Sequence, residues 1–289
     1  MPKSLVHVHR ASGRHWVGDG FPVQTVFGYD DLGQHLSPYL MFDYAAPTRF
    51  EPASKPRGVG EHPHRGFETV TVVFQGELEH RDSGGGGGRI GPGDVQWMTA
   101  AGGIVHDEFH SEAFTREGGE LHMAQLWVNL PAAHKRAAPA YQSLLADEIP
   151  VVDLAGGGTV RLISGAYGGH GGAARTFTPV ILWEITLPDS ASADLPAPEG
   201  WNLSVFPLSG SVTASGQTVP AGSLGIFSRE GADATIRAAG PARLLVLGGE
   251  PIDEPVVGYG PFVMNTREEI LEAFRDFQAG RMGQLAPAS

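Results

Sequence analysis

Two stretches of this sequence follow the same plan, and that repetition limits the possible folds more than any other feature. Residues 71–76 and 91–97 frame the first copy, and residues 203–210 and 220–227 frame the second. Each copy runs through a strand, a glycine, a second strand, a Pro/Gly turn and a third strand. Repeated supersecondary units indicate repeated structural modules. The sequence therefore predicts an internal duplication of a β-barrel unit.

Short runs rich in β-branched and aromatic residues support this interpretation. They occupy residues 69–74, 95–98, 124–128, 160–163 and 180–187. Such runs are typical of strands. The 41 glycines and 22 prolines of the 289-residue chain follow no fixed period, which favours many short strands joined by tight turns. We expect a mainly all-β fold of two antiparallel β-barrel domains.

The domain boundary is expected in a mixed segment near residues 131–155, where Pro131, Pro139 and Pro150 interrupt the chain. This gives an N-terminal domain at residues 1–135 and a C-terminal domain at residues 136–289. A length of 289 residues fits two domains of ordinary size.

One helix is predicted near the C-terminus. Thr266 and Glu269 have the spacing of a capping box, in which a hydroxyl and a carboxylate satisfy the first free backbone N–H groups. Apolar residues then recur at helical spacing, and Gly280 can end the helix. We expect the apolar stripe to pack on a barrel, although a helix that binds a partner stays open. The stripe consists of Ile270, Leu271, Phe274 and Phe277.

Composition excludes several classes of site. The chain has no cysteine, which excludes disulfides, thiolate zinc sites, iron–sulfur clusters and a cysteine nucleophile. The first ten residues lack the apolar run expected of a signal peptide, and no apolar run is long enough to span a membrane. The formal charge of −12 disfavours direct nucleic-acid binding. We expect a soluble cytoplasmic protein.

Two pairs of metal-ligating side chains stand out. His62 and His64 are two residues apart, and so are His106 and Glu108. Residues i and i+2 of a strand project from the same face, so the two pairs can converge on one point. Imidazoles and a carboxylate suit a divalent transition metal, particularly non-haem iron. Parity also allows Glu68 as the carboxylate ligand or as a charged group beside the metal, because it continues the face of His62 and His64.

Other candidate features have plainer interpretations. His7 and His9 are near the N-terminus without a second pair, so we do not expect them to bind metal. His110 and His122 follow the site in sequence, and His110 is expected beside it or on the surface rather than as a ligand. Five glycines at 84–88 lack the ending of a phosphate-binding loop and are expected at a hairpin tip.

Longer motifs resemble the pirin family of the cupin superfamily. The strongest matches are residues 62–70 (HPHRGFETV), 90–100 (IGPGDVQWMTA) and 103–106 (GIVH) with Glu108. Supporting matches are residues 16–23, 36–43, 125–131 and 261–266, so the resemblance covers nearly the whole chain.

The resemblance implies two cupin, jelly-roll-like barrels with one metal in the N-terminal barrel. It implies the ligands His62, His64, His106 and Glu108, and it leaves Glu68 near the site. No histidine occurs in residues 171–289, so the second barrel is expected to be structural or an interaction surface.

The function that the resemblance implies is that of a metal-dependent dioxygenase of the quercetin 2,3-dioxygenase type, with iron as the expected metal. Such an enzyme opens a small aromatic flavonol with O2 and releases carbon monoxide. Within this hypothesis Glu108 accepts the substrate proton once it leaves the metal, and Glu68 is the alternative base. The alternative is a non-enzymatic, metal-binding regulatory protein that a protein partner recognises. A metal-dependent cupin enzyme acting on another small molecule also stays open.

Overall fold

The structure is a computed structural model that describes residues 1–11 and 13–286, and it contains two compact β-rich units. The first unit comprises residues 1–11, 35–39 and 147–251, and the second comprises residues 13–34, 40–146 and 252–286. The chain passes from the second unit to the first between residues 146 and 147, inside the expected segment 131–155. The chain ends differ from the prediction, because residues 1–11 belong to the unit of residues 147–251 and residues 252–286 belong to the other.

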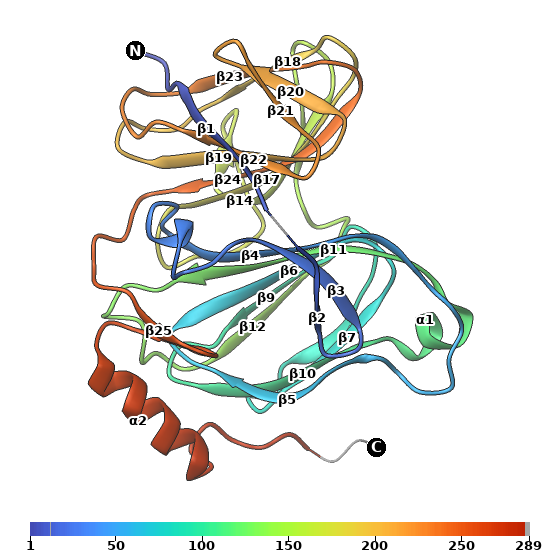
Figure 1. The fold of residues 1–289 in the computed structure, drawn as a ribbon, viewed down its shortest axis with the longest axis vertical. Coiled ribbons are helices and arrows are strands. Elements are labelled where there is room, and N and C mark those ends of the chain that lie inside the picture. The colour runs from blue at the N-terminus through green and yellow to red at the C-terminus, as the bar shows by residue number, and fades with distance from the viewer. Residues whose placement is uncertain (12, 287–289) are drawn as a thin grey trace. The chain divides into compact units, whose positions relative to one another are not determined.

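Each unit contains a seven-stranded and a four-stranded sheet (Figure 1). In the second unit the large sheet has the following order: β12 (Ala140–Leu144), β9 (Val95–Thr99), β6 (Phe67–Gln75), β11 (Gly119–Asn129), β4 (Tyr39–Phe50), β3 (Phe21–Phe27) and β2 (His15–Val17). The small sheet has the order β5 (Gly58–His64), β10 (Ile104–His110), β7 (Leu78–Asp82) and β8 (Gly87–Ile90).

The first unit repeats this topology strand for strand. Its large sheet has the following order: β1 (Leu5–Arg10), β22 (Ser223–Phe227), β19 (Asn202–Ser209), β24 (Ala242–Gly249), β17 (Val180–Leu187), β14 (Thr159–Ser164) and β13 (Val151–Asp153). Its small sheet has the order β18 (Ser192–Leu195), β23 (Ala234–Ala238), β20 (Ser211–Ala214) and β21 (Gln217–Pro220). The predicted duplication and the all-β fold of two barrels are therefore confirmed.

The remaining elements are short. A 3-10 turn covers Leu32–Gln34, α1 covers Glu112–Glu117 and α2 covers Arg267–Gln278. Two hairpins complete the fold: β15 (Ala166–Tyr167) with β16 (His170–Gly171), and β25 (Val257–Tyr259) with β26 (Phe262–Met264). Within the described part of the chain, no helix has both the length and the apolar character needed to cross a membrane.

The glycines that end the first strand of each repeat explain part of the duplication. Gly76 follows β6 with φ +86°, and Gly210 follows β19 with φ +71°. A side chain at Gly210 would place its Cβ 2.2 Å from the carbonyl oxygen of Pro241. Positive φ together with close backbone contact favours glycine at such turns.

Strand β1 explains why the first residues join the first unit. It pairs antiparallel with β22 and forms the edge of that sheet, as β12 does beside β9 in the second unit. The edge strand of the first unit therefore comes from the N-terminus of the chain, whereas the second unit uses a strand that follows β11. Hydrophobic alternation does not reveal which distant strand pairs with an edge.

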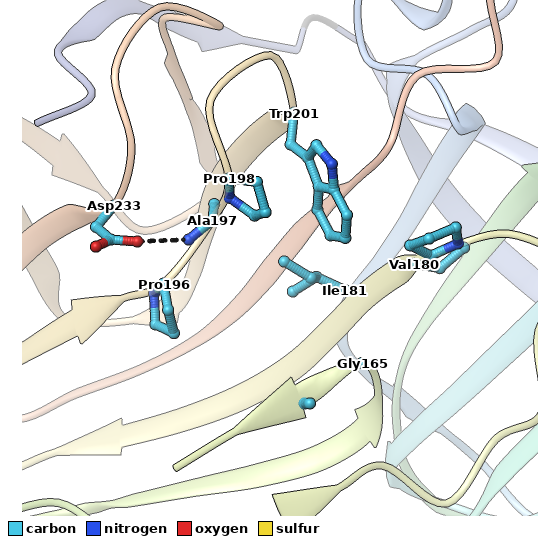
Figure 2. A pocket seen from close by; sticks show the side chains of 10 residues that line it. Gly165, Val180, Ile181, Pro196, Ala197, Pro198, Trp201 and Asp233 are labelled. Carbon is cyan, nitrogen blue, oxygen red and sulfur yellow. Dashed lines mark hydrogen bonds between the residues drawn. The ribbon is translucent and has the colours of Figure 1, made fainter. Parts of the chain in front are cut away.

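Among the described residues, the first unit has apolar side chains on the strands that correspond to those of His62, His64, His106 and Glu108. The strands that correspond to β5 and β10 are β18 and β23, and they contribute Ala193, Leu195, Ala234 and Ile236 to an apolar core. An open cavity of about 530 Å³ also lies in this unit, with Pro198 and Trp201 among its lining residues (Figure 2). These strands place aliphatic side chains where the other unit has histidines.

Helix α2 begins as predicted. Thr266 accepts a hydrogen bond from the backbone N–H of Glu269, and the Glu269 carboxylate accepts from the backbone N–H of Thr266. Ile270 packs in a cluster with Val105 and Phe262, but Leu271 is 61% exposed. The helix therefore packs on the second unit through only part of its predicted stripe.

An ion pair also attaches α2 to the turn after β5. Arg65 donates from Nη2 to Asp276 Oδ2 at 2.7 Å and from Nε to the carbonyl oxygen of Gly102 at 2.6 Å. Both side chains of the ion pair are largely buried. Removing one partner leaves the other charge poorly solvated, which is costly.

We therefore expect Asp276→Ala to lower the free energy of local unfolding of α2 by about 2 kcal/mol, which is less than the loss for a fully buried pair. Amide hydrogen exchange should become roughly 30-fold faster in residues 267–278 than in the wild type, while β6 and β11 stay protected. Glu268→Ala, at an exposed position of the same helix, is the matched control. Equal exchange in both variants would show that the ion pair does not hold the helix.

Candidate metal centre

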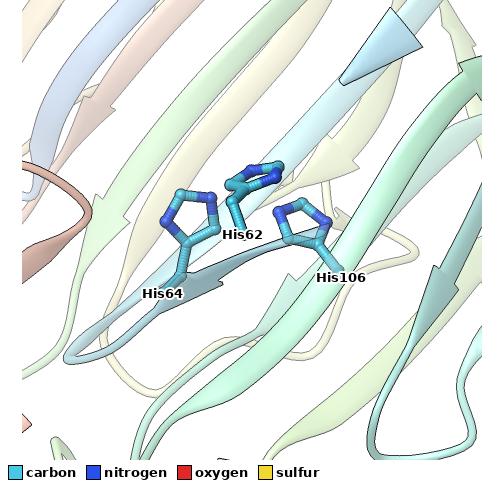
Figure 3. Close-up of side chains that lie close together, drawn as sticks. All are labelled: His62, His64 and His106. Atoms are coloured by element: carbon cyan, nitrogen blue, oxygen red, sulfur yellow. The ribbon is translucent and has the colours of Figure 1, made fainter. Parts of the chain in front are cut away.

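Three histidine side chains meet on the paired strands β5 and β10. His62 lies directly opposite His106 in the antiparallel register, and His64 lies opposite Ile104. The ring centroids are 4.2 Å apart for His62 and His106, and 4.8 Å apart for the other two pairs. Figure 3 shows the three rings side by side above the strands. One nitrogen of each lies within 4.8 Å of the other two, so the three could share one metal ion.

Backbone carbonyl groups orient two of these rings. His62 Nδ1 lies 2.9 Å from the carbonyl oxygen of Gly60, and His64 Nδ1 lies 3.3 Å from that of Pro261. A carbonyl oxygen only accepts, so in each ring Nδ1 carries the hydrogen and Nε2 keeps its lone pair. Metal-binding histidines usually donate their other ring N–H in this way. Both rings are therefore prepared to bind a metal through Nε2.

His106 is fully buried, and its Nδ1 faces another imidazole rather than a carbonyl group. Its Nδ1 lies 3.3 Å from His80 Nδ1, and its Nε2 has no hydrogen-bond partner among the described residues. A buried nitrogen without a partner is costly unless something else binds it. Burial, together with the neighbouring histidines, holds the pKa values of His106 and His64 well below the usual histidine value. Both rings are therefore neutral, which is the form that binds metal.

Glu108 lies on the same strand as His106, after a bulge that shifts the register. Its Oε1 accepts from Gln96 Nε2 at 2.8 Å and from Thr71 at 3.4 Å, and its Oε2 accepts from Gln125 Nε2 at 2.8 Å. The amide donors fix a buried carboxylate that would otherwise be unpaired.

The structure does not bring the four predicted ligands into one set: Glu108 falls outside the set of three predicted histidines, and its own set adds His80, which was not predicted. One set is His62, His64 and His106, and the other is His80, His106 and Glu108. Glu108 and His62 also line one cavity of about 30 Å³. Imidazole nitrogens and a carboxylate oxygen suit a divalent transition metal better than calcium or magnesium. The residues present fit such a metal.

Glu68 requires a correction to its predicted position. The prediction treated residues 62–74 as one strand with alternating faces. The chain instead turns at Gly66 and enters a different sheet, so residues before and after this turn do not share a face. Gly66 has φ +93°, and a Cβ there would lie 1.9 Å from the carbonyl oxygen of Val263. Glu68 therefore projects from the face of β6 opposite to Thr71, the residue that contacts Glu108.

The carboxylate of Glu68 has its own buried partner. Thr99 lies opposite Glu68 in the strand register, and its hydroxyl donates to Glu68 Oε1 at 2.6 Å. Burial raises the pKa of Glu68 to about 7. Glu68 is therefore outside both metal-ligating sets, and this geometry does not support a role as the base.

The other histidines have separate environments. His110 Nε2 lies 2.9 Å from the carbonyl oxygen of Gly20, and its ring packs among aromatic side chains including Phe50. His122 Nε2 lies 2.9 Å from the Tyr44 hydroxyl. Within the described residues, neither belongs to a set that could hold a metal.

The polar side chains that support the site were not predicted from the sequence. His80 and Asp82 are two residues apart on β7, the same spacing that identified the other pairs, but they carried no separate prediction. Gln96 and Gln125 come from strands of the opposite sheet. Each is a polar residue in a mainly apolar run, and that pattern could have identified them.

Comparisons with known proteins agree with this architecture. Residues 20–128 match the model of the family described as Pirin, and residues 182–283 match that of the Pirin C-terminal cupin domain. Together the two matches cover more than half of the chain.

Individual relatives match along nearly the full chain. A Pseudomonas aeruginosa protein named "Putative quercetin 2,3-dioxygenase PA2418" is 51% identical over 96% of this chain and 98% of its own. A crystal structure of quercetin 2,3-dioxygenase from Acinetobacter baumannii is 47% identical, with a TM-score of 0.95 over 98% of this chain and 99% of that one. A bacterial pirin from Escherichia coli, crystallised with nickel(II), shares the fold at 20% identity, with a TM-score of 0.64 over 85% and 99%.

Proposed function

The chain belongs to the pirin family of the cupin superfamily, and from this premise we propose that it is a metal-dependent dioxygenase of the quercetin 2,3-dioxygenase type. Its substrates would be a flavonol and O2. One observation carries the proposal: the buried Nε2 of His106 has no hydrogen-bond partner among the described residues, and His62 and His64 lie close enough to share a metal ion with it.

In this proposal His62, His64, His106 and Glu108 hold the metal, and the metal is iron. When bound, the metal supplies Lewis-acid and redox chemistry to the substrate hydroxyl and to O2. The Nδ1 atoms of the three imidazoles contact the protein's own polar groups, so each ring would offer Nε2 to the metal.

Glu108 is the proposed proton acceptor for the flavonol hydroxyl. Gln96 and Gln125 each donate one hydrogen bond to it, one on each carboxylate oxygen. Glu108 would take up the proton after leaving the metal, and these bonds would keep the released carboxylate near the substrate. Glu68 has no part in this step, because its carboxyl group lies on the other face of β6.

The size of the cavity restricts how a flavonol could reach the site. The cavity beside His62 and Glu108 holds about 30 Å³, roughly one-tenth of the smallest usual ligand pocket. His62 is only half-buried, whereas His64 and His106 are buried. The substrate would therefore approach at the edge of His62, and the cavity would have to widen for the rings to enter.

A second candidate function draws support from the same restriction. An open groove of about 740 Å³ runs along α2, and Tyr259 and Leu271 on it are 67% and 61% exposed. A small metal cavity together with an exposed apolar surface is expected of a regulatory, metal-binding protein that a protein partner recognises.

One assay separates these functions. Purified protein is stripped of metal, loaded with Fe(II) without oxygen, analysed for bound metal and mixed with quercetin. Admitting O2 should bleach the flavonol absorbance and release carbon monoxide, and metal-free protein should do neither. An unchanged spectrum in a fully loaded sample would reject the dioxygenase proposal and favour the second candidate.

A further inference from the structure

A buried hydrogen-bonded pair, His80 and Asp82, lies behind His106 and is not accounted for by the four proposed ligands. His80 is 2% exposed, and its Nε2 lies 3.2 Å from Asp82 Oδ2. On its other side, His80 Nδ1 lies 3.3 Å from His106 Nδ1. The three side chains thus form a chain of contacts that ends at the proposed metal.

The hydrogen bonds of Asp82 determine which nitrogen of His80 carries a hydrogen. Its Oδ1 accepts from the backbone N–H groups of Gly84 and Gly86, at 2.8 and 2.9 Å. Those donors stabilise the ionised carboxylate, so Oδ2 acts as an acceptor toward His80. His80 Nε2 must then carry the hydrogen, and His80 Nδ1 keeps its lone pair.

A second donor confirms the direction of the bond at His80 Nδ1. Gln96 Nε2 lies 3.2 Å from that nitrogen and 2.8 Å from Glu108 Oε1. The carboxylate can only accept, so it orients the Gln96 NH2 group toward both atoms. His80 Nδ1 is therefore an acceptor without a hydrogen, so a hydrogen bond between the two imidazoles requires the hydrogen on His106 Nδ1.

We propose that Asp82 and His80 are positioning residues that hold His106 in its Nδ1–H tautomer, leaving Nε2 free for the metal. The inference rests on the proposed metal centre but not on flavonol cleavage. Outer partners of metal-binding histidines commonly change metal affinity 10- to 100-fold when they are replaced. The competing role for His80 is that of a direct ligand together with His106 and Glu108.

The tautomers can be observed directly in the wild-type protein. With 15N-labelled histidine, long-range 1H–15N correlation spectra of metal-free protein should show His80 with hydrogen on Nε2 and His106 with hydrogen on Nδ1. A His106 ring with hydrogen on Nε2 would overturn the proposal, and this measurement requires no variant to fold.

Asp82→Asn should reverse the donor and acceptor roles in the hydrogen bonds that link residue 82, His80 and His106. The Asn oxygen can still accept from Gly84 and Gly86, but its NH2 group donates to His80 Nε2 and moves the His80 hydrogen to Nδ1. His106 Nδ1 then faces a donor, so its hydrogen should move to Nε2. We expect affinity for Ni(II), measured by competition with a coloured chelator, to fall about 10- to 100-fold with one binding site retained. Wild-type affinity with an unchanged His106 tautomer would overturn the proposal.

Two substitutions of His80 distinguish a positioning residue from a ligand. His80→Asn keeps a carbonyl oxygen near Nδ1 that accepts from His106, whereas His80→Leu does not. We expect Asn to stay within a few-fold of wild-type Ni(II) affinity and Leu to lose about 10- to 100-fold. If both variants lose stoichiometric binding, His80 is a ligand and the proposal is wrong.

His122→Leu is the matched control, because His122 is also buried and bonded to a polar side chain but lies outside the site. It should bind Ni(II) as tightly as the wild type. Failure of the quercetin assay would leave these affinity and tautomer measurements unaffected, so the two proposals fail separately.

Discussion

Replacing His106 with alanine should remove most of the bound metal while both barrels stay folded. His106 is the residue shared by both metal-ligating sets, and its free Nε2 is fully buried. Losing a ligand should reduce affinity by more than the loss of an outer partner, so we expect a decrease of at least about 100-fold. Elemental analysis of the purified variant, after loading with excess metal and desalting, measures the effect.

The fold of this variant should persist because the cores are apolar. The core of the first unit includes Trp183 and Leu244, and that near the site includes Phe21 and Met123. Far-UV circular dichroism should match the wild type. His122→Ala, at a buried histidine outside the site, should keep both its metal and its fold. Full metal occupancy in His106→Ala would reject the assignment of His106 as a ligand.

Local patterns predicted the strands, the duplication and the helix correctly. The expected strand at residues 180–187 coincides with β17, and the capping box at Thr266 and Glu269 begins α2. These features depend on neighbouring residues and on periodicity, which a sequence displays directly. Strand parity likewise predicted that His62 and His64 converge with His106 and Glu108, and the structure groups the three histidines but leaves Glu108 outside their set.

Features that depend on pairing between distant strands could not be predicted. The sequence does not show that β1 pairs with β22, or that Arg65 bonds to Asp276 on α2. The support of Glu108 by Gln96 and Gln125 also requires the opposite sheet to be in place. A single turn at Gly66 was enough to reverse the predicted orientation of Glu68.

The position of Glu68 gives a prediction for stability rather than for metal binding. Burial raises its pKa to about 7 in the folded protein, from an ordinary value near 4.5. Between these pH values the folded state keeps a proton that the unfolded state has released. The free energy of unfolding should therefore fall as pH rises from about 4.5 to about 7, by up to about 3 kcal/mol.

Glu68→Gln cannot ionise and should lose this pH dependence, while its side-chain oxygen can still accept from Thr99. Denaturant unfolding of metal-free protein at pH 5 and pH 8 measures the effect. The stability of the variant relative to the wild type should increase by up to about 3 kcal/mol between these pH values. Glu120→Gln, at an exposed position, should show no such change.

Metal content should equal that of the wild type in both variants, because Glu68 lies on the opposite face of β6 from the residue that contacts Glu108. Loss of metal in Glu68→Gln with an unchanged pH profile would instead support the sequence-based placement of Glu68 beside the metal.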